Sequence, residues 1–300
     1  AGCNSRARAS RAACMGALPA ARGGVCLSIV SYERAEWIRA LLTNALALAE
    51  PSTRIGLHLN ARSPFAASEL ASFEAAGGGG RVTLSPVRVT VERSRGSILY
   101  AHLLNFRQLE AAWPLHCSHG VLQASNSMWV RPGWEAAVRT AGFSLGQDAV
   151  RWAPPLEVAA AHPFYRNVTT RGRHSWTYHE GSFYPMNELQ AFRARLDAWL
   201  TAPGRELQRD VLQAFPFPEE FWLQNYVLNE GRGGRLALPV RTRQLCLRDD
   251  ARGETQLVSP AMVDATASGA TEYFAVKRVP RLVDHPIVRR IAQLTRPAAP

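Results

Sequence analysis

Lysine is almost missing from this sequence: Lys277 is the only lysine among 35 basic residues, and all the others are arginines. The formal net charge of +11 invites a nucleic-acid-binding interpretation. However, the arginines are scattered, and no recognition helix or basic-aromatic module is present. Arginine in place of lysine, beside abundant alanine and glycine, is typical of a GC-rich genome. Composition therefore argues against nucleic-acid binding and favours a general attraction of anionic ligands such as diphosphates.

Long apolar runs are also lacking. No stretch approaches the roughly 20 uninterrupted apolar residues that a bilayer span requires, so we expect a soluble chain. Since the sequence begins with Ala1 and not with methionine, a membrane anchor or targeting segment could precede it. One Asn-x-Thr acceptor at Asn167 permits passage through a secretory lumen. The expected localisation is the Golgi lumen in a eukaryote, and otherwise the cytoplasm or a membrane surface.

The cysteines form no closely spaced pair. None lies in a Cys-x-x-Cys motif, which argues against a zinc site. Their odd number and wide spacing fix no disulfide framework, so the redox compartment stays open. The five are Cys3, Cys14, Cys26, Cys117 and Cys246.

Alternating strand and helix patterns predict an α/β protein. With 47% hydrophobic and 20% charged residues over 300 positions, the chain can form one large domain. Residues 1–24 have no apolar period and predict a disordered basic arm, so the domain is expected over 25–295. Residues 25–32 form an apolar run typical of a buried strand, an amphipathic helix follows, and residues 54–60 form a second strand. This order predicts a parallel sheet.

Further elements follow along the chain. Residues 81–92 have a strand-like pattern, 97–113 an amphipathic helical one, and 120–124 that of a short strand. The segment 125–130 leads to a turn, and helices with mixed loops are expected from 140 to 295. Sequence repeats are absent.

Polar residues follow three of the predicted strands. In an open α/β sheet, ligands bind beyond the carboxyl ends of the strands. This places a binding site at the segments Ser31–Arg34, Asn60–Ser63 and Ser125–Met128. The candidate ligand-binding residues there are Ser31, Glu33, Arg34, Asn60, Ser125 and Asn126.

Two acidic residues begin a predicted helix in the C-terminal half. Pro218 is well placed at the helix start, and Glu219 and Glu220 follow in the first turn. Two acids at this position stabilise a helix through its dipole by roughly 0.3–1 kcal/mol each. Alternatively, one carboxylate projects into a cleft and removes a proton from a hydroxyl group. The sequence leaves both interpretations open.

Two short segments carry a resemblance to a known family. Gly181-Ser182-Phe183-Tyr184 and, after a helix, Pro218-Glu219-Glu220-Phe221-Trp222 resemble a block of the core-2/I-branching N-acetylglucosaminyltransferases and their plant and bacterial relatives. The resemblance covers about residues 25–290 in order of elements and matches closely only in short stretches. It implies a GT-A fold, a single domain with a Rossmann-like open mixed sheet flanked by helices, and an inverting mechanism with Glu220 as catalytic base. Trp222 lies one residue closer to the glutamate than in the family, so Glu219 is the second candidate.

Two further segments resemble the same family. Arg243-Gln244-Leu245-Cys246 is similar to its Arg-x-x-Cys strand, and Phe274-Ala275-Val276-Lys277-Arg278 is similar to its Phe-Ala-x-Lys-Phe segment. By this resemblance Arg243 and Lys277 hold the donor diphosphate. The alternative for Lys277 is an exposed cation near a strand end. By their location, Glu33 and Arg34 are expected to face the nucleobase or ribose.

The Asp-x-Asp motif that holds a metal in most GT-A enzymes has no counterpart here. Ser125-Asn126-Ser127 stands in its place, and hard cations prefer carboxylate oxygens. We therefore expect neither metal nor cofactor, in keeping with the metal independence of the resembling family. Trp176, Glu180 and Tyr184 are candidate acceptor-binding residues, with purely structural roles as the alternative.

The sequence thus predicts an inverting, metal-independent transfer of a sugar, GlcNAc or xylose, from a UDP-sugar to a hydroxyl of a glycan or glycoprotein. Two alternatives stay open. One is a GT-A enzyme of different donor and stereochemistry. The other is a catalytically silent protein that binds an anionic polymer or partner.

Overall fold

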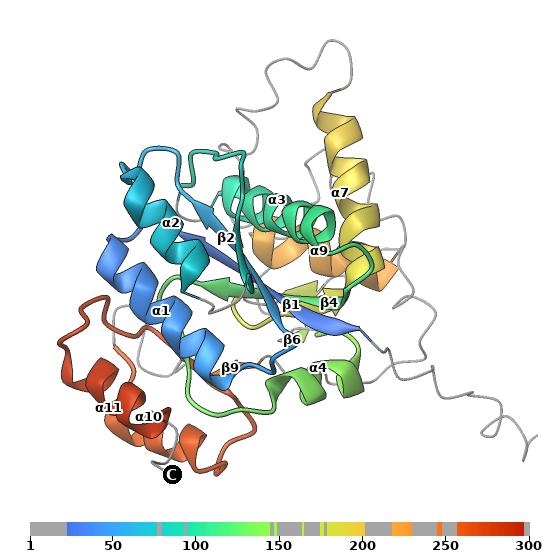
Figure 1. Ribbon diagram of the computed structural model, residues 1–300. Helices are drawn as coiled ribbons and strands as arrows, with labels where there is room; N and C mark the ends of the chain where they lie inside the picture. Colours follow the sequence, from blue (N-terminus) through green and yellow to red (C-terminus); the bar gives the residue numbers. More distant parts are fainter. Residues whose placement is uncertain are drawn as a thin grey trace, which may run out of the picture.

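The fold is built on a five-stranded mixed sheet (Figure 1). The computed structural model describes residues 23–76, 80–92, 95–144, 147–148, 164, 175–176, 179–201, 218–229, 245–247 and 257–296, without the side chains of 147–148, 175–176, 218–220 and 228–229. The sheet order is β3-β2-β1-β4-β8, in which the first four strands are parallel and β8 is antiparallel to β4. The predicted α/β class, with an open mixed sheet flanked by helices, is confirmed.

The N-terminal half follows the predicted order closely. The strand expected over 25–32 is β1, the helix after it is α1, and the strands and helix expected near 54–60, 97–113 and 120–124 are β2, α3 and β4. Their bounds are β1 Gly24–Ser31, α1 Ala35–Leu48, β2 Arg54–Leu59, α2 Ala67–Ala75, β3 Val82–Leu84, α3 Gly96–Ala112 and β4 Cys117–Ala124.

The long strand expected over 81–92 is wrong in extent. Only Val82–Leu84 pairs with β2. Ser85 still donates its N–H to the Leu57 carbonyl of β2 at 3.0 Å, but Pro86 comes next and has no N–H to donate to a strand ladder. Beyond it the chain packs against the loop after β2, where Ala61 donates its N–H to the Val89 carbonyl at 3.0 Å.

The described residues also form two smaller sheets. One has the order β5-β10-β9, with β10 antiparallel to β5 and parallel to β9, and the other pairs β6 with β7. The segment 125–130, which was expected to lead from β4 to a turn, includes the short strand β5. The remaining bounds are β5 Ser127–Trp129, α4 Trp134–Ala141, β6 Gln147–Asp148, β7 Ser175–Trp176, β8 Phe183–Pro185, α7 Met186–Leu200, α9 Pro218–Asn229, β9 Cys246–Leu247, α10 Pro260–Ala267, β10 Ala275–Lys277 and α11 Pro286–Leu294.

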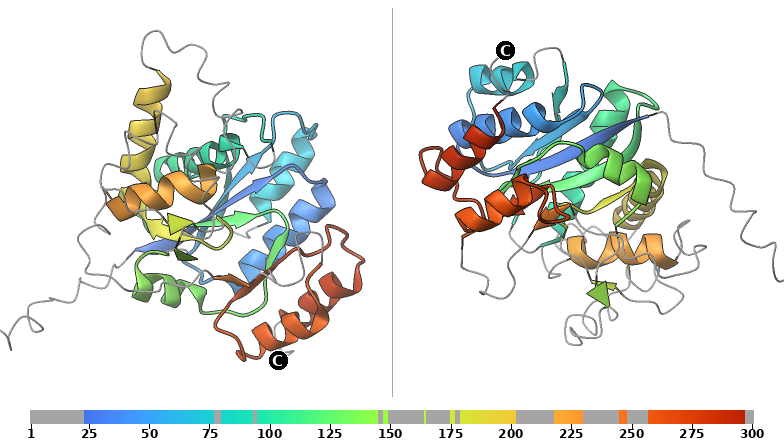
Figure 2. Two further views of the ribbon diagram at one scale, coloured as in Figure 1. Left: turned by 180° about the vertical axis from the view of Figure 1, so that it is seen from behind. Right: turned by 90° about the horizontal axis from the view of Figure 1, so that it is seen from below.

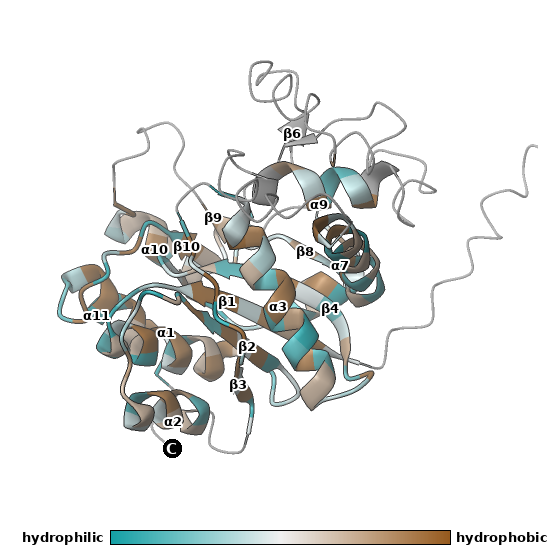
Figure 3. Ribbon diagram, turned by 90° about the horizontal axis from the view of Figure 1, so that it is seen from above, coloured by the Kyte–Doolittle hydropathy of each residue, from teal (hydrophilic) through white to brown (hydrophobic). Residues whose placement is uncertain are grey.

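Each face of the central sheet has its own apolar core. Side chains alternate along a strand, so Val25, Leu27 and Ile29 of β1 pack with α1 and the β5-β10-β9 sheet, whereas Cys26 faces α3, α7 and α9. Figure 2 shows α10 and α11 side by side, away from α7. Figure 3 shows hydrophobic residues concentrated on β1, β2 and β3, between the helices.

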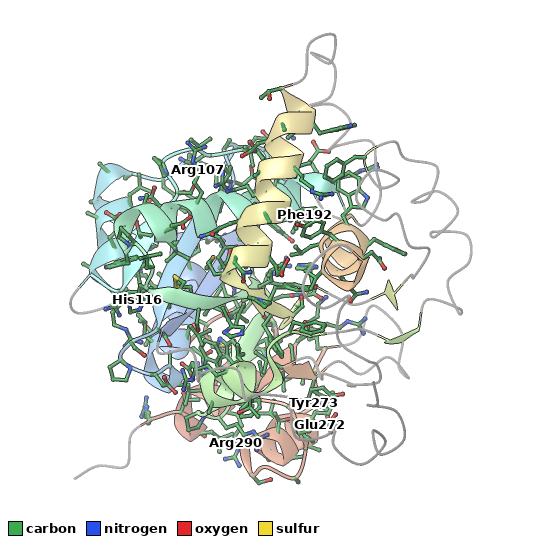
Figure 4. The ribbon with its side chains drawn as sticks, turned by 90° about the vertical axis from the view of Figure 1, so that its right-hand side faces the viewer. Arg107, His116, Phe192, Glu272, Tyr273 and Arg290 are labelled. Carbon is green, nitrogen blue, oxygen red and sulfur yellow. A yellow bond between two sulfur atoms is a disulfide. The ribbon has the colours of Figure 1, made fainter. Side chains whose placement is uncertain are left out.

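Aromatic side chains pack α9 against α7 on the side of the central sheet that α3 covers. Phe192 of α7 points toward α9 (Figure 4) and meets the ring of Tyr226 with centroids 5.3 Å apart. Trp222 is fully buried, and the centre of its ring lies 5.0 Å from the centre of the Phe164 ring. The apolar helix face predicted from Trp222 and Tyr226 is therefore buried as expected, and α9 begins at Pro218 as predicted.

Candidate functional site

The carboxyl ends of β1 and β4 bring three predicted residues together. These strands are parallel neighbours, so they end at the same edge of the sheet. Ser31 closes β1, and its hydroxyl oxygen accepts the backbone N–H of Glu33 at 3.2 Å. Ser125 follows β4 and donates its hydroxyl to the Glu33 carboxylate at 3.0 Å. Glu33 thereby bridges the two strand ends.

Arg281 joins this cluster and was not predicted from the sequence. It follows β10 and reaches back to β1, with Nε 3.0 Å from Oε1 of Glu33. Its guanidinium also donates to the Tyr32 hydroxyl at 3.1 Å and lies 5.2 Å from the centre of the Tyr32 ring. Burial raises the pKa of Glu33 above its usual value, against the opposing effects of Arg281 and Ser125. No spacing in the sequence links positions 33 and 281; only the crossing of the chain brings them together.

Lys277 lies at the same edge of the molecule. It ends β10, where it pairs in antiparallel register with Ser127 of β5. Arg278 has a positive φ of 65°, and Val279 then donates its N–H to the Asn126 carbonyl at 3.0 Å. The backbone of the Ser125–Ser127 segment therefore holds the strand that carries the only lysine.

Glu180 forms an ion pair and hydrogen bond with Lys277. From the sequence, Glu180 was expected to contact the acceptor and Lys277 the donor. His179 Nε2 lies 3.6 Å from the same carboxylate oxygen. Burial would raise the pKa of Glu180, but His179 and Lys277 outweigh it and lower the pKa below its usual value. The carboxylate of Glu180 is therefore already engaged by Lys277 and lies beside His179.

A buried polar cluster lies between β1 and α3, next to His179. None of its residues was predicted from the sequence. Asn105 donates to the Ser28 hydroxyl oxygen at 2.9 Å, and the same hydroxyl forms a hydrogen bond with Nδ1 of His102 at 2.7 Å. His102 is fully buried, which keeps its pKa well below the usual value. Its ring contacts that of His179 at 5.8 Å. Polar residues inside an apolar strand and helix, Ser28 and His102, were the available signal.

Other predicted residues have different surroundings. Asn60 follows β2, but its amide donates to the Val91 carbonyl at 3.1 Å and accepts the N–H groups of Arg62 and Val91. Arg34 precedes α1, and its side chain is exposed. Tyr184 of β8 is buried in the apolar core on the α3 face. Asn60 and Tyr184 are thus held by the protein interior.

Four predicted residues cannot be placed by their side chains. Glu219 and Glu220 lie in the first turn of α9, and Trp176 lies in β7. Their side chains are outside the described part of the chain. Arg243 lies outside the described residues altogether.

A cavity of about 250 Å³ lies at the other end of β4, between α3 and α7. Cys117 and Ser118, which begin β4, contribute to its lining. It is therefore separate from the carboxyl edge, and none of the predicted residues lines it. Among the described residues, no group of three or more His, Cys, Asp or Glu side chains is arranged to hold a metal ion. None of the described helices combines the length and apolar character that a bilayer span needs.

Comparisons with known proteins give only distant likenesses. No family model matches the chain, and no curated protein matches it significantly. A solved structure of the galactosyltransferase LgtC in complex with donor and acceptor sugar analogues has 10% identity and a TM-score of 0.40, covering 90% of this chain and 95% of that one. Mouse xyloside xylosyltransferase 1, in its apo form, has 11% identity and a TM-score of 0.36, covering 85% and 97%. Scores of this size carry no functional weight, so function has to be argued from the site.

Proposed function

We propose that this protein is a GT-A glycosyltransferase that transfers a sugar from a UDP-sugar to a hydroxyl of a glycan or glycoprotein. The observation that carries the proposal is the position of Lys277. The only lysine of the chain ends β10 and pairs with Ser127, which belongs to the segment Ser125–Met128 that the sequence analysis proposed as part of a binding site. A fixed cation beside a Ser-Asn-Ser turn is suited to bind a diphosphate without a metal ion.

The proposed reaction is an inverting displacement. The acceptor hydroxyl gives its proton to the carboxylate of Glu220, and its oxygen forms a bond to the anomeric carbon of the donor. The bond from that carbon to the diphosphate oxygen breaks on the opposite face, and UDP leaves with the electron pair. Arg243 and Lys277 stabilise the negative charge of the departing diphosphate. GlcNAc or xylose is the proposed sugar, and Trp176 is the proposed acceptor contact.

A secretory lumen is the proposed location. Cys26 and Cys117 form a disulfide, and disulfides persist in oxidising compartments such as the secretory pathway. Expression in reducing and in oxidising hosts, followed by a free-thiol assay, tests this. A protein that keeps both thiols reduced after oxidising expression would contradict the proposal.

Thermal shift with nucleotides tests the donor class. A ligand that binds only the folded state raises the melting temperature. The proposal predicts that UDP and a UDP-sugar raise it, with or without EDTA, and that GDP and CMP do not. Stabilisation by another nucleotide, or stabilisation that EDTA abolishes, would contradict it.

Exchange of Glu220 tests the catalytic base. Glu220→Gln should lower kcat by about a hundredfold or more, because removal of a general base commonly costs this much. Glu219→Gln is the matched variant one residue away and should keep most of the activity. The anomeric configuration of the product, read by NMR, separates inversion from retention. Near-normal turnover by Glu220→Gln would remove the assignment.

The net charge of +11 favours one alternative, a binding protein for an anionic polymer. Its affinity would fall steeply with salt, because binding would release counterions from the polymer. Tight, salt-dependent polyanion binding without any stabilisation by UDP would favour this alternative over the enzyme.

A further inference from the structure

Lys277 and Glu180 reach one another from two different sheets. Lys277 ends β10, the middle strand of the small sheet, and Glu180 lies in the turn before β8 of the central sheet. Their ion pair is largely shielded from water, with 13% of the Lys277 side chain and 5% of the Glu180 side chain exposed. A charge pair at such a position is costly to desolvate and needs fixed geometry.

The turn that carries Glu180 is tied to both sheets. Gly181 donates its N–H to the Leu122 carbonyl of β4 at 2.7 Å, and its carbonyl accepts the N–H of Leu245 at 3.1 Å. Gly181 has a φ of +75°, and a Cβ there would lie 2.7 Å from the backbone N of Cys246. Ser182 also closes the turn by donating its hydroxyl to the His179 carbonyl at 2.6 Å. The Glu180 backbone is therefore held in place independently of Lys277.

The carboxylate of Glu180 is directed at other side chains of the protein. Oε1 meets both Lys277 and His179, and Oε2 is buried without a hydrogen-bond partner. A side chain that is 5% exposed offers little surface to an acceptor sugar. Lys277 pairs through its backbone with Ser127, so it lies beside the Ser125–Ser127 segment.

We infer that Glu180 is a positioning residue for Lys277, which holds the ammonium group where the donor diphosphate binds, and that it is not an acceptor contact. This inference rests on the proposed function, because it assigns a donor to that edge. Glu180 fixes a long, flexible lysine side chain in advance, so less conformational entropy is lost when the diphosphate binds.

The single lysine makes the contact directly measurable. Acetylation with acetic anhydride, read by mass spectrometry of the peptide containing Lys277, reports one side chain only. The ion pair with Glu180 holds the amine of Lys277 where only 13% of the side chain is exposed, which limits access of the reagent. Glu180→Gln should therefore increase the acetylation rate of Lys277 about tenfold, because a neutral amide holds the amine less tightly than a carboxylate does. Glu135→Gln is the matched control: Glu135 is buried too, but it binds Thr53 and the Glu50 N–H at the amino ends of the strands, and its exchange should leave the rate unchanged.

UDP binding then separates a donor role from an acceptor role. Calorimetry should show UDP bound about tenfold more weakly by Glu180→Gln, with the KM of the acceptor unchanged. Glu180→Asp keeps the charge but is one methylene shorter, and it should give smaller changes in the same direction. Should Glu180→Gln fail to fold, the same measurements on Glu180→Asp decide.

The outcomes are distinct. Unchanged acetylation of Lys277 would overturn the inference, and so would unchanged UDP affinity combined with a raised acceptor KM. Faster acetylation in a protein that binds no UDP, even as the wild type, would show that the contact exists but that the proposed function, and with it the donor role of Glu180, is wrong.

Discussion

The buried histidines His58 and His102 are held in the neutral form by their surroundings. His58 of β2 is fully buried, and its Nε2 accepts the Val89 N–H at 3.2 Å. Burial lowers the pKa of His58 from 6.5 to about 4, and burial lowers that of His102 as well. At pH values between about 4 and 6.5, the unfolded chain binds a proton at His58 that the folded chain excludes. Stability from neutral His58 is therefore complete above the unfolded value and is lost as pH falls toward 4.

This predicts an acid-sensitive fold. The shifted pKa of His58 should lower the free energy of unfolding by about 2 kcal/mol between about pH 7 and about pH 5, and His102 should add to this loss in the same direction. His58→Gln keeps an acceptor near the Val89 N–H but cannot take up a proton, so it should reduce that loss by about the same amount. Urea unfolding of both proteins at the two pH values measures it. Equal losses in the variant and the wild type would contradict the prediction.

Gly181 is the residue on which the turn before β8 depends. Gly181→Ala should lower the free energy of unfolding by at least about 3 kcal/mol, because it combines a left-handed φ with a clash against backbone atoms. Gly133→Ala is the matched control. Its φ is +89°, but the nearest atom to an added Cβ lies 3.9 Å away, so only the strain of about 1 kcal/mol should appear. Similar losses in both variants, measured by urea unfolding, would show that the close approach to Cys246 has no energetic weight.

At the scale of the elements, the two central strands are linked covalently. The Cys26–Cys117 disulfide joins β1 to β4 across 91 residues, and the same pair is held by parallel hydrogen bonding from Gly24 to Val30. Because the loop it closes is long and contains α1, β2, α2, β3 and α3, the link restricts much of the unfolded chain.

Loss of the disulfide should destabilise the protein markedly. Cys117→Ser should lower the free energy of unfolding by about 2–4 kcal/mol, the usual range for a native disulfide. Reductant should lower the stability of the wild type by a similar amount and leave that of Cys117→Ser unchanged. A wild type that is insensitive to reductant under unfolding conditions would contradict the assignment.

Over the whole molecule, sequence patterns predicted the strands and helices whose formation depends on burying their own apolar side chains. The apolar run at 25–32 and the helical spacing through Trp37 and Leu41 predicted β1 and α1, because burial of these side chains forms the core. The strand over 81–92 failed because Pro86 ends its pairing. The β5-β10-β9 sheet was not predicted. Its strands have only two or three residues each, so they show no detectable period, and they depend on partners far along the chain.

The candidate site was likewise only partly predictable from the sequence. The rule that ligands bind at carboxyl strand ends singled out Ser31, Glu33 and Ser125, which the structure brings together. The family resemblance singled out Lys277, and the binding roles of all four stay predictions. Arg281 was missed, since only the tertiary fold brings it to Glu33. The Lys277–Glu180 pair was missed as a pair, because distance in sequence hides a contact between two sheets. The roles of Glu220, Arg243 and Trp176 stay predictions.

Titration of UDP into the protein in the presence of EDTA, followed by calorimetry, tests most directly whether the carboxyl edge binds a nucleoside diphosphate through Lys277. The wild type should bind, and Lys277→Gln, whose amide can still donate to Glu180, should bind about tenfold to a hundredfold more weakly. Arg290→Gln removes one positive charge on α11, where Arg290 pairs with Asp264, and should bind like the wild type. Equal UDP affinity in the wild type and Lys277→Gln, or no binding by the wild type, would contradict the account.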